Sequence, residues 1–420
     1  CNERCAHCYA DSMPKTYRSE MIKQKNGNRE SIPLATVDVQ FPNGDVRSRM
    51  TYKDWLQTIK DAYDLGCRRG QFIGGEPFLY KGENGETVLD LAEYAVNLGY
   101  EMVEIYTNGT LLTGKKVHRI KELGLNIAIS LYSDDPLVHD SITRTPGSHK
   151  KTMASLHMLK EAGIRTRVEM VLMRTNQHTV DSTLALRESM GFNGKNPDPL
   201  RPKGRGDNPM LQPDFSQLVK YGLILQPNFR ASKHTIAHYS SGHSCLLGKA
   251  TITEFGDVLP CIFSRNLIVG NVFVSDGLPN IIHAQATQKI WQATKDDVLV
   301  CQDCEYRYVC FDCRPLSEGV SEGRASYQNA PYPRCTYNPY TGIWAEGLWR
   351  VNEEGKPVYD ESFGPMIQEH IKGISQKQMN APVEHLEVRQ GIHLPLCSLF
   401  NKYYSNRIKH WHKNEAFFNF

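Results

Sequence analysis

The chain has 420 residues, and its 49 Lys and Arg against 46 Asp and Glu leave a formal net charge of +3. This near balance gives no reason to expect a nucleic-acid partner, because such partners require a strong basic excess. No apolar stretch reaches the roughly 18 residues of a membrane span and no signal peptide is visible, so we predict no membrane partner and a cytoplasmic location. The length allows two or three domains.

Twelve cysteines are too few for a disulfide scaffold, and they are clustered along the chain. Disulfide scaffolds usually exceed about 8–10% Cys in short secreted chains. Clustered cysteines in a chain of this length indicate metal binding in a reducing compartment. Two short basic runs, over 201–205 and 402–413, are expected to form solvated faces.

Cys1, Cys5 and Cys8 stand in C-x3-C-x2-C spacing at the start of the chain. Three thiolates on one short loop can hold three corners of a cubane iron–sulfur cluster. With no fourth Cys on the loop, one iron keeps an open position, as catalytic metal sites do. A zinc knuckle or a chance spacing is the alternative. A strand normally leads into such a loop, so we expect a further strand, and residues upstream of Cys1.

Residues 11–50 are polar, with a predicted hairpin over 37–49, and a stretch of this length is often a binding loop or mobile. From Thr51 onwards, helices and strands alternate, with a capping box at Thr51 and Asp54 that starts a helix running to Gly66. We predict helices over 88–98, 117–123, 153–162 and 183–190, and strands over 71–73, 102–106, 127–131 and 168–173, with a weak fifth strand over 197–201. The alternation is typical of βαβ units and a parallel sheet. It predicts an α/β fold, a partial (β/α)6 TIM-like barrel open along one edge, with ligands at the carboxyl ends of its strands.

Polar motifs follow the predicted strands. Gly74-Gly75-Glu76-Pro77 comes directly after the 71–73 strand, where glycines let a ligand approach the backbone and a carboxylate can accept bonds from an ammonium group. Alone, such a segment is usually a tight turn. Asn108 and Ser130 end the next two strands, and His139-Asp140-x3-Arg144 follows. The alternative for these residues is a turn role for Asn108 and Ser130, and a surface charge for Arg144.

The order of these motifs resembles the radical S-adenosylmethionine (radical SAM) enzymes. The resemblance implies that Cys1, Cys5 and Cys8 hold a [4Fe-4S] cluster whose unique iron chelates S-adenosylmethionine (SAM), and that an electron from the cluster cleaves SAM to a 5′-deoxyadenosyl radical. It further implies which residues bind SAM: Gly74, Gly75 and Glu76 at the methionyl amino group, Asn108 at the third-strand turn, Ser130 at the ribose and Arg144 at the carboxylate. A guanidinium binds a carboxylate bidentately. The family more often places this Arg three residues after the Asp, whereas here it is the fourth.

A second cysteine array lies in the C-terminal half, with short predicted strands over 250–253 and 268–272 between its cysteines. It resembles the seven-cysteine pattern of the SPASM domain, a small irregular β-hairpin/helix iron–sulfur domain of many radical SAM enzymes, although two residues instead of three separate Cys310 from Cys313. The resemblance assigns one auxiliary [4Fe-4S] cluster to Cys245, Cys261 and Cys313, and a second to Cys301, Cys304, Cys310 and Cys335. His243 could complete the first cluster or be an ordinary satisfied polar residue. Two zinc sites are the competing interpretation.

Two cysteines fall outside these groups: Cys67 is expected to be a core thiol, and Cys397 has no predicted role. The aromatic-rich segment after Cys335 is expected to be a packed tail, or less simply a peptide-binding surface. We therefore predict a radical SAM core over 1–235, a SPASM domain over 236–345, and an extension of unassigned role over 346–420.

The segments 71–77, 130–132, 139–143 and 201–205 look most like those of SPASM enzymes that modify ribosomally made peptides. The resemblance implies three [4Fe-4S] clusters, SAM, a precursor peptide as substrate, and an electron donor such as flavodoxin or ferredoxin. The expected reaction removes a hydrogen from a peptide side chain and forms a cross-link, while an auxiliary cluster takes the product electron or positions the substrate. The alternatives are oxidation of a Cys or Ser side chain in a sulfatase, a small-molecule dehydrogenation, and a non-catalytic metal-bearing binding module. No catalytic acid or base is assigned.

Overall fold

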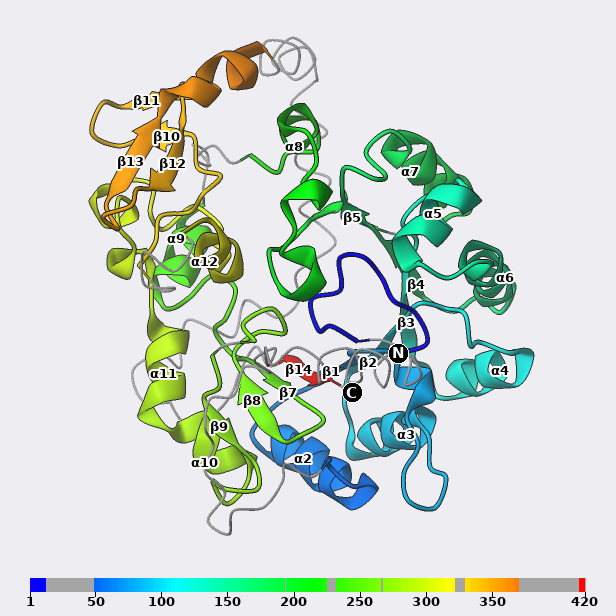
Figure 1. Ribbon diagram of the computed structural model, residues 1–420. Coiled ribbons are helices and arrows are strands. Elements are labelled where there is room, and N and C mark those ends of the chain that lie inside the picture. Colours follow the sequence, from blue (N-terminus) through cyan, green and yellow to red (C-terminus); the bar gives the residue numbers. More distant parts are fainter. Residues whose placement is uncertain are drawn as a thin grey trace, which may run out of the picture.

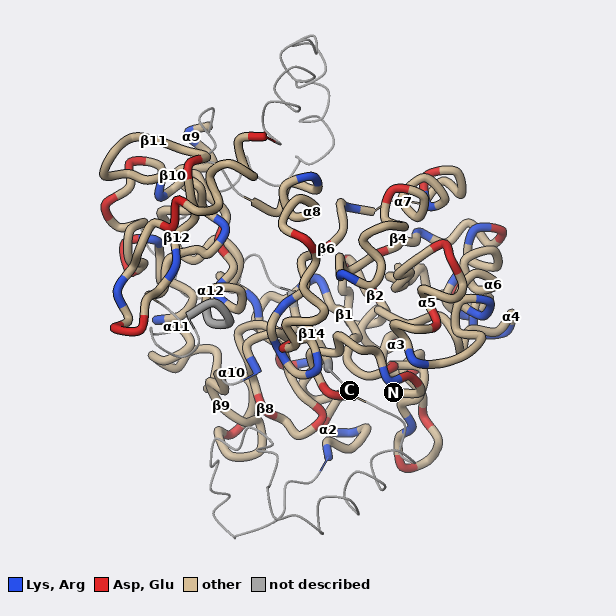
Figure 2. Tube along the Cα trace, turned by 45° about the horizontal axis from the view of Figure 1, so that its top comes forward, with Lys and Arg blue, Asp and Glu red and all other residues tan. Residues whose placement is uncertain are grey.

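The computed structural model describes residues 1–12, 49–192, 194–224, 232–265, 267–321, 329–369 and 415–419. The predicted hairpin, apart from its last residue, lies outside these ranges, as do the 402–413 basic run and Cys397. Within the described ranges, none of the helices combines the length and the apolar character that a membrane crossing requires. Figure 2 shows Lys and Arg intermixed with Asp and Glu along the outer helices and hairpins.

An eight-stranded sheet forms the centre of the described molecule, in the order β4-β3-β2-β1-β14-β7-β8-β9. The strands from β4 to β7 are parallel to one another, whereas β8 is antiparallel to both β7 and β9. The predicted α/β class with a mostly parallel sheet is confirmed. The bounds are β1 Arg69–Ile73, β2 Met102–Thr107, β3 Asn126–Ser130, β4 Thr166–Glu169, β7 Lys249–Ile252, β8 Asp257–Leu259, β9 Gly270–Asn271 and β14 Glu415–Asn419.

Helices follow the first strands in the predicted order (Figure 1). The predicted capping box is present, since Thr51 Oγ1 accepts from the Asp54 amide while the Asp54 carboxylate accepts from the Thr51 amide. The helix that ends before Gly99 does so because Gly99 adopts a left-handed conformation with φ of 102°. The helices are α2 Tyr52–Asp64, α3 Val88–Leu98, α4 Gly114–Glu122, α5 Pro136–Thr143, α6 Ser148–Glu161 and α7 Val180–Ser189, of which α5 was not predicted.

The strand that pairs with β1 on the side away from β2 comes from residues 415–419. β14 lies parallel between β1 and β7, with Phe418 opposite Phe72 and Ile252 (Figure 1). The Phe418 side chain is fully buried, and its ring centroid lies 5.2 Å from that of Phe72 and 6.1 Å from that of Trp55. The end of the chain is therefore part of the hydrophobic core, as the packed-tail alternative predicted for the aromatic residues.

The predicted strand over 168–173 is broken in two. β4 ends at Glu169, and β5 (Val171–Leu172) turns to pair with β6 (Asp198–Pro199), which is the weak fifth strand of the sequence. The Asp198 amide donates to the Met170 carbonyl at 2.7 Å. The break directs the chain after β6 away from the sheet, toward the cysteine loop.

The C-terminal half consists of short elements around the second cysteine array, with β7–β9 continuing the core sheet. The division into domains therefore stays a prediction. The helices here are α8 Phe215–Lys220, α9 Lys233–Ser240, α10 Leu278–His283, α11 Gln285–Gln292 and α12 Arg314–Ser321. The two hairpins are β10 Tyr337–Asn338 with β11 Ile343–Trp344, and β12 Leu348–Val351 with β13 Pro357–Asp360.

Candidate active site

The cysteine loop is held against the end of α5. The Arg4 amide donates to the Thr143 carbonyl at 3.1 Å, and the Ala6 amide donates to the Ile142 carbonyl at 2.8 Å. Cys5 packs beside the small apolar cluster that contains Ile142. These contacts place the loop, dark blue in Figure 1, beside the strands from which the predicted SAM-binding residues follow.

The segment after β1 approaches this loop closely, as its glycines predicted. A Cβ at Gly75 would lie 3.1 Å from the Cys1 backbone nitrogen and 3.4 Å from the Ser12 hydroxyl oxygen. Gly74 has φ of 137°, a conformation that disfavours other residues. A larger residue at either position would fill the space beside the cysteine loop or strain the turn.

Glu76 is the buried carboxylate of this site, with a side chain only 3% exposed. One carboxylate oxygen accepts from Thr107 Oγ1 at 2.7 Å and the Phe78 amide at 3.2 Å, and the other accepts from the Asn108 amide at 2.9 Å. Burial raises the pKa of Glu76, and these hydrogen bonds act in the opposite direction. The structure thus brings Glu76 and Asn108 together, and fixes an acceptor beside the loop.

Two asparagines join the loop to the end of β2. Asn108 Nδ2 donates to Asn2 Oδ1 at 2.9 Å, and Asn2 Nδ2 donates to Thr110 Oγ1 at 2.7 Å. Ser130, at the end of β3, is buried and donates to the Tyr106 hydroxyl at 3.4 Å. The exposed Arg144 caps α5 with φ of 52°, directly after the residues that bind the loop backbone. The binding roles of these residues stay predictions.

A hydrogen-bonded chain beneath the loop was not predicted. The Glu3 carboxylate, 1% exposed, accepts from Ser148 Oγ, which lies 3.3 Å from His139 Nε2, while His139 Nδ1 accepts from the Tyr132 amide. Burial raises the pKa of Glu3 to about 7 and lowers that of His139 to about 4. Because the members lie as far as 145 residues apart in sequence, no local pattern could have revealed this chain.

The 201–205 basic run is not a solvated face, which corrects the sequence expectation. Arg205 Nε donates to the Cys5 carbonyl at 2.9 Å, its Nη2 donates to the Ser12 carbonyl at 2.7 Å, and its amide donates to the Cys8 carbonyl at 3.0 Å. Lys203 is buried as well. The sequence reveals a run of basic residues but not the groups that accept their hydrogen bonds. Here three backbone carbonyls of the cysteine loop accept hydrogen bonds from Arg205.

The first predicted auxiliary group comes together in space. Burial raises the pKa of the Cys245 thiol to about 12, and the neighbouring Cys261 and Cys313 thiols contribute to the shift. Such thiols stay protonated until a metal binds, and binding then releases their protons. The three cysteines are therefore neighbours, although their role as ligands stays a prediction.

The second predicted group is also together. Burial raises the pKa of the Cys335 thiol to about 12, and the nearby Cys301 and Cys310 thiols contribute to this rise. Burial and the same two thiols also raise the pKa of Cys304. The positive charge of the buried Lys295 ammonium opposes these shifts, because it lowers the pKa values of Cys301 and Cys335. Sequence spacing found the cysteines, but gave no signal for this cation.

His243 has a structural use of its own. Its Nδ1 accepts from the Cys245 and Leu246 amides, each at 3.1 Å, and its Nε2 lies 3.7 Å from a carboxylate oxygen of Asp312. Burial lowers the pKa of His243 to about 4, so the ring is neutral near pH 7. His243 Nε2 is buried and has no hydrogen-bond partner among the described residues, so both the ordinary polar role and the cluster-ligand role stay predictions. Cys67 is fully buried in the core, as predicted.

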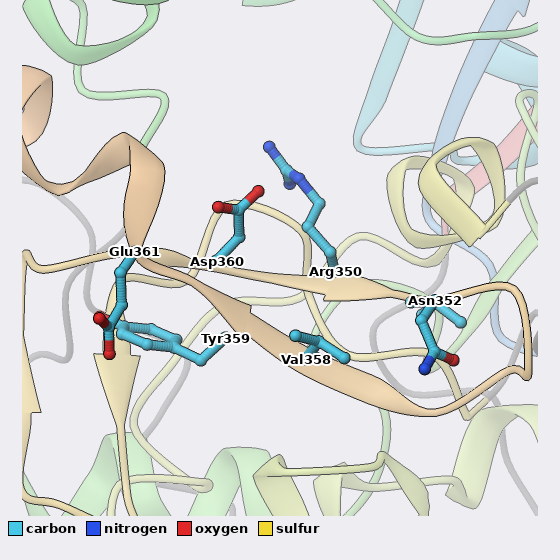
Figure 3. A pocket seen from close by; sticks show the side chains of 7 residues that line it. Arg350, Asn352, Val358, Tyr359, Asp360 and Glu361 are labelled. Atoms are coloured by element: carbon cyan, nitrogen blue, oxygen red, sulfur yellow. The ribbon is translucent and has the colours of Figure 1, made fainter.

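Within the described ranges, no three His, Cys, Asp or Glu side chains are arranged to hold a single metal ion. A surface depression on the β12–β13 hairpin is lined by Arg350, Val351, Asn352, Val358, Tyr359, Asp360 and Glu361 (Figure 3). It includes neither a cysteine nor a predicted SAM-binding residue, so it is separate from this site.

Comparison with known proteins supports the family resemblance predicted from the N-terminal cysteine loop and the C-terminal cysteine array. Residues 1–186 match the radical SAM superfamily, and residues 245–305 match the SPASM iron–sulfur cluster-binding domain. The chain is 24% identical over 307 residues to the antilisterial bacteriocin subtilosin biosynthesis protein AlbA of Bacillus subtilis, covering 70% of this chain but only 59% of AlbA. It is 23% identical to an AdoMet-dependent heme synthase of Oleidesulfovibrio alaskensis, covering 81% of this chain and 85% of that protein.

Among solved structures, Streptococcus suis SuiB bound to precursor peptide SuiA superposes with a TM-score of 0.51 at 17% identity, covering 76% of this chain and 81% of SuiB. At this identity the likeness shows the fold. The chain therefore contains a radical SAM domain over residues 1–186 and a SPASM domain over residues 245–305, and these domains indicate an enzyme that works with SAM, a [4Fe-4S] cluster and auxiliary iron–sulfur clusters.

Proposed function

We propose that this enzyme matures a ribosomally made precursor peptide, removing a hydrogen atom from one side chain and forming a cross-link. The observation that carries the proposal is the pairing of a closely held three-cysteine loop with two further cysteine groups on one chain. The similarity to AlbA and the fold of SuiB, solved with a precursor peptide, favour a peptide substrate.

The chain's own residues have distinct tasks in this proposal. The Glu76 carboxylate accepts a hydrogen bond from the ammonium group of SAM. Gly74 and Gly75, which have no side chains, leave room for this group. Ser130 contacts the ribose, and Arg144 pairs with the SAM carboxylate. Cys1, Cys5 and Cys8 hold the cluster that, when bound, supplies the radical chemistry.

The proposal includes two auxiliary [4Fe-4S] clusters, on the two cysteine groups described above. Cys245, Cys261 and Cys313 would hold one cluster and Cys301, Cys304, Cys310 and Cys335 the other. When bound, either would supply electron-transfer chemistry, and an external donor such as flavodoxin or ferredoxin would supply electrons for the first cluster. The burial of the C-terminal thiols fits this role, because solvent exposure is one of the factors that set the reduction potential of an iron–sulfur cluster.

Two anaerobic measurements test the proposal. Purified enzyme reduced with dithionite and given SAM is expected to form 5′-deoxyadenosine, and Cys5→Ala is expected to abolish it while the auxiliary iron remains. Short peptides encoded beside the gene, co-expressed with the enzyme, are then expected to lose two hydrogen atoms by mass spectrometry. Loss of all iron in Cys5→Ala, or no change in any such peptide, would contradict the proposal.

A small-molecule substrate is the second candidate, because the heme synthase match covers more of this chain than the AlbA match does. In that case SAM cleavage would rise with a tetrapyrrole and not with a peptide. Oxidation of a peptide Cys or Ser, as in a sulfatase, is distinguished by fragmentation: it places an aldehyde on one residue, whereas a cross-link joins two.

A further inference from the structure

Arg201 lies between the radical SAM core and the first auxiliary cysteine group. It follows β6, and its guanidinium stacks 4.1 Å above the ring centroid of Phe263, two residues after Cys261. The guanidinium is close enough to the Cys313 and Cys261 thiols for its charge to act on both, and its Nη1 donates to the Pro199 carbonyl at 3.4 Å. Arg201 Nε is buried and has no hydrogen-bond partner among the described residues.

The unpartnered Nε of the positively charged Arg201 lies near the cysteine thiols, as expected if an anionic group binds among these thiols. A buried N–H without an acceptor costs about 1–3 kcal/mol, so such donors are rare unless a further group satisfies them. Three thiolates and a cubane cluster form a site with net negative charge, which gains a further negative charge on reduction. The arrangement therefore fits a cluster bound among these thiols, with the Arg201 guanidinium beside it.

We propose that Arg201 sets the redox balance of the first auxiliary cluster, by holding a fixed positive charge beside it. The proposal rests on the assignment of Cys245, Cys261 and Cys313 to that cluster. A cation beside a cluster stabilises the reduced state more than the oxidised state. Arg201 thus raises the reduction potential.

The raised potential matters for the proposed reaction. After hydrogen abstraction, the substrate forms its new bond by giving one electron to the cluster and one proton to solvent, and the cluster is reduced by that one electron. A cluster that is easier to reduce accepts this electron more readily. Lys249, on β7, also acts as a charge on Cys245 and Cys261, whereas Arg201 stacks on Phe263, two residues after Cys261, and keeps an unpartnered Nε.

The position of Arg201 is fixed from the side of the SAM site. Arg205, on the same segment, binds the Cys5 and Ser12 carbonyls, and Tyr9 of the cysteine loop meets Phe263 edge-on at 4.9 Å between ring centroids. Arg201 and Tyr9 thus both contact Phe263. The cation therefore cannot drift from the auxiliary group without disturbing the first cysteine loop.

The test is a redox titration of the full-length enzyme, reconstituted anaerobically and followed by electron paramagnetic resonance. The signal absent from Cys261→Ala identifies the first auxiliary cluster. Arg201→Gln is expected to lower the midpoint potential of that signal alone, and Arg201→Lys to give an intermediate value, because it keeps the charge but not the planar fork. Arg187→Gln is the matched control, since Arg187 is also a buried arginine with an unpartnered Nε, but lies on α7 away from the cysteines.

An unchanged midpoint potential in Arg201→Gln with full iron content would overturn the proposal. If Arg201→Gln loses the iron of one cluster while Arg201→Lys retains it at a near-native potential, the need for the charge is supported. If both variants lose that iron, Arg201 is a packing residue and the proposal fails. If instead Cys261→Ala loses neither iron nor a signal, the cluster assignment itself is wrong, which separates that failure from a failure of Arg201.

Discussion

Arg205→Met should release the first cysteine loop while leaving the fold intact. Arg205 is buried on most of its side chain, 19% exposed, and donates two side-chain hydrogen bonds to loop carbonyls, at Cys5 and Ser12. Methionine keeps much of the aliphatic volume and removes both donors. The backbone bond from residue 205 to the Cys8 carbonyl remains.

The magnitude follows from these two bonds. A hydrogen bond from a charged donor contributes about 1.5–3 kcal/mol, so the variant loses about 3–6 kcal/mol of loop stabilisation. A whole domain is typically stable by about 5–15 kcal/mol. The loop therefore opens often while the remainder stays folded, because local opening can occur far below the global unfolding free energy.

The assay combines iron content with the spectroscopic response of the reduced cluster to SAM. Arg205→Met is expected to lose the iron of one cluster, together with the SAM-induced change in its paramagnetic signal, and to keep the auxiliary iron. The control is Arg174→Met, because Arg174 is an exposed arginine whose ion pair with Asp214 at 3.0 Å is worth at most about 1 kcal/mol. Full iron and a native SAM response in Arg205→Met would refute the reasoning.

Three further changes test other parts of the site and fold. Glu76→Gln places an amide where an oxygen accepts from Asn108, and should weaken SAM binding about 10–100-fold by calorimetric titration of the reconstituted enzyme, whereas native affinity would exclude the proposed ammonium contact. Phe418→Ala should lower the free energy of unfolding by about 3–5 kcal/mol in denaturant titration, because the ring is fully buried against Phe72, and unchanged stability would contradict the place of β14 in the sheet. Cys304→Ala should retain SAM cleavage but stop product formation, and full turnover would count against an auxiliary role for this cysteine.

The first half of the sheet was predictable because its signals are local. The capping box at Thr51 and the left-handed Gly99 lie within a few residues of the helix ends that they define. The place of β14 was not predictable in the same way, because a strand's neighbour in a parallel sheet can be any part of the chain. Its short aromatic sequence indicates burial, but nothing in it specifies β1 as its partner.

The same distinction explains the candidate site. Cysteine spacing and the glycines before Glu76 are local patterns, and the sequence found both groups of thiols and the buried carboxylate. Glu3 and Lys295 act through partners distant in sequence, so their burial was not visible. The prediction of a solvated face for the 201–205 run was wrong, because the sequence shows the charged residues but not the backbone carbonyls to which they donate hydrogen bonds.

The contacts of Arg201 and Arg205 explain the glycine between them, at position 204. Four residues apart, they face different cysteine groups, so the segment between them sets the spacing of the SAM site and the first auxiliary group. Gly204 makes that spacing possible: its φ is 54°, and a Cβ there would lie 2.6 Å from the Cys8 carbonyl oxygen. The segment is thus held by backbone contact at its centre and by one guanidinium at each end. This short segment therefore connects the loop that carries Cys1, Cys5 and Cys8 with the first auxiliary group.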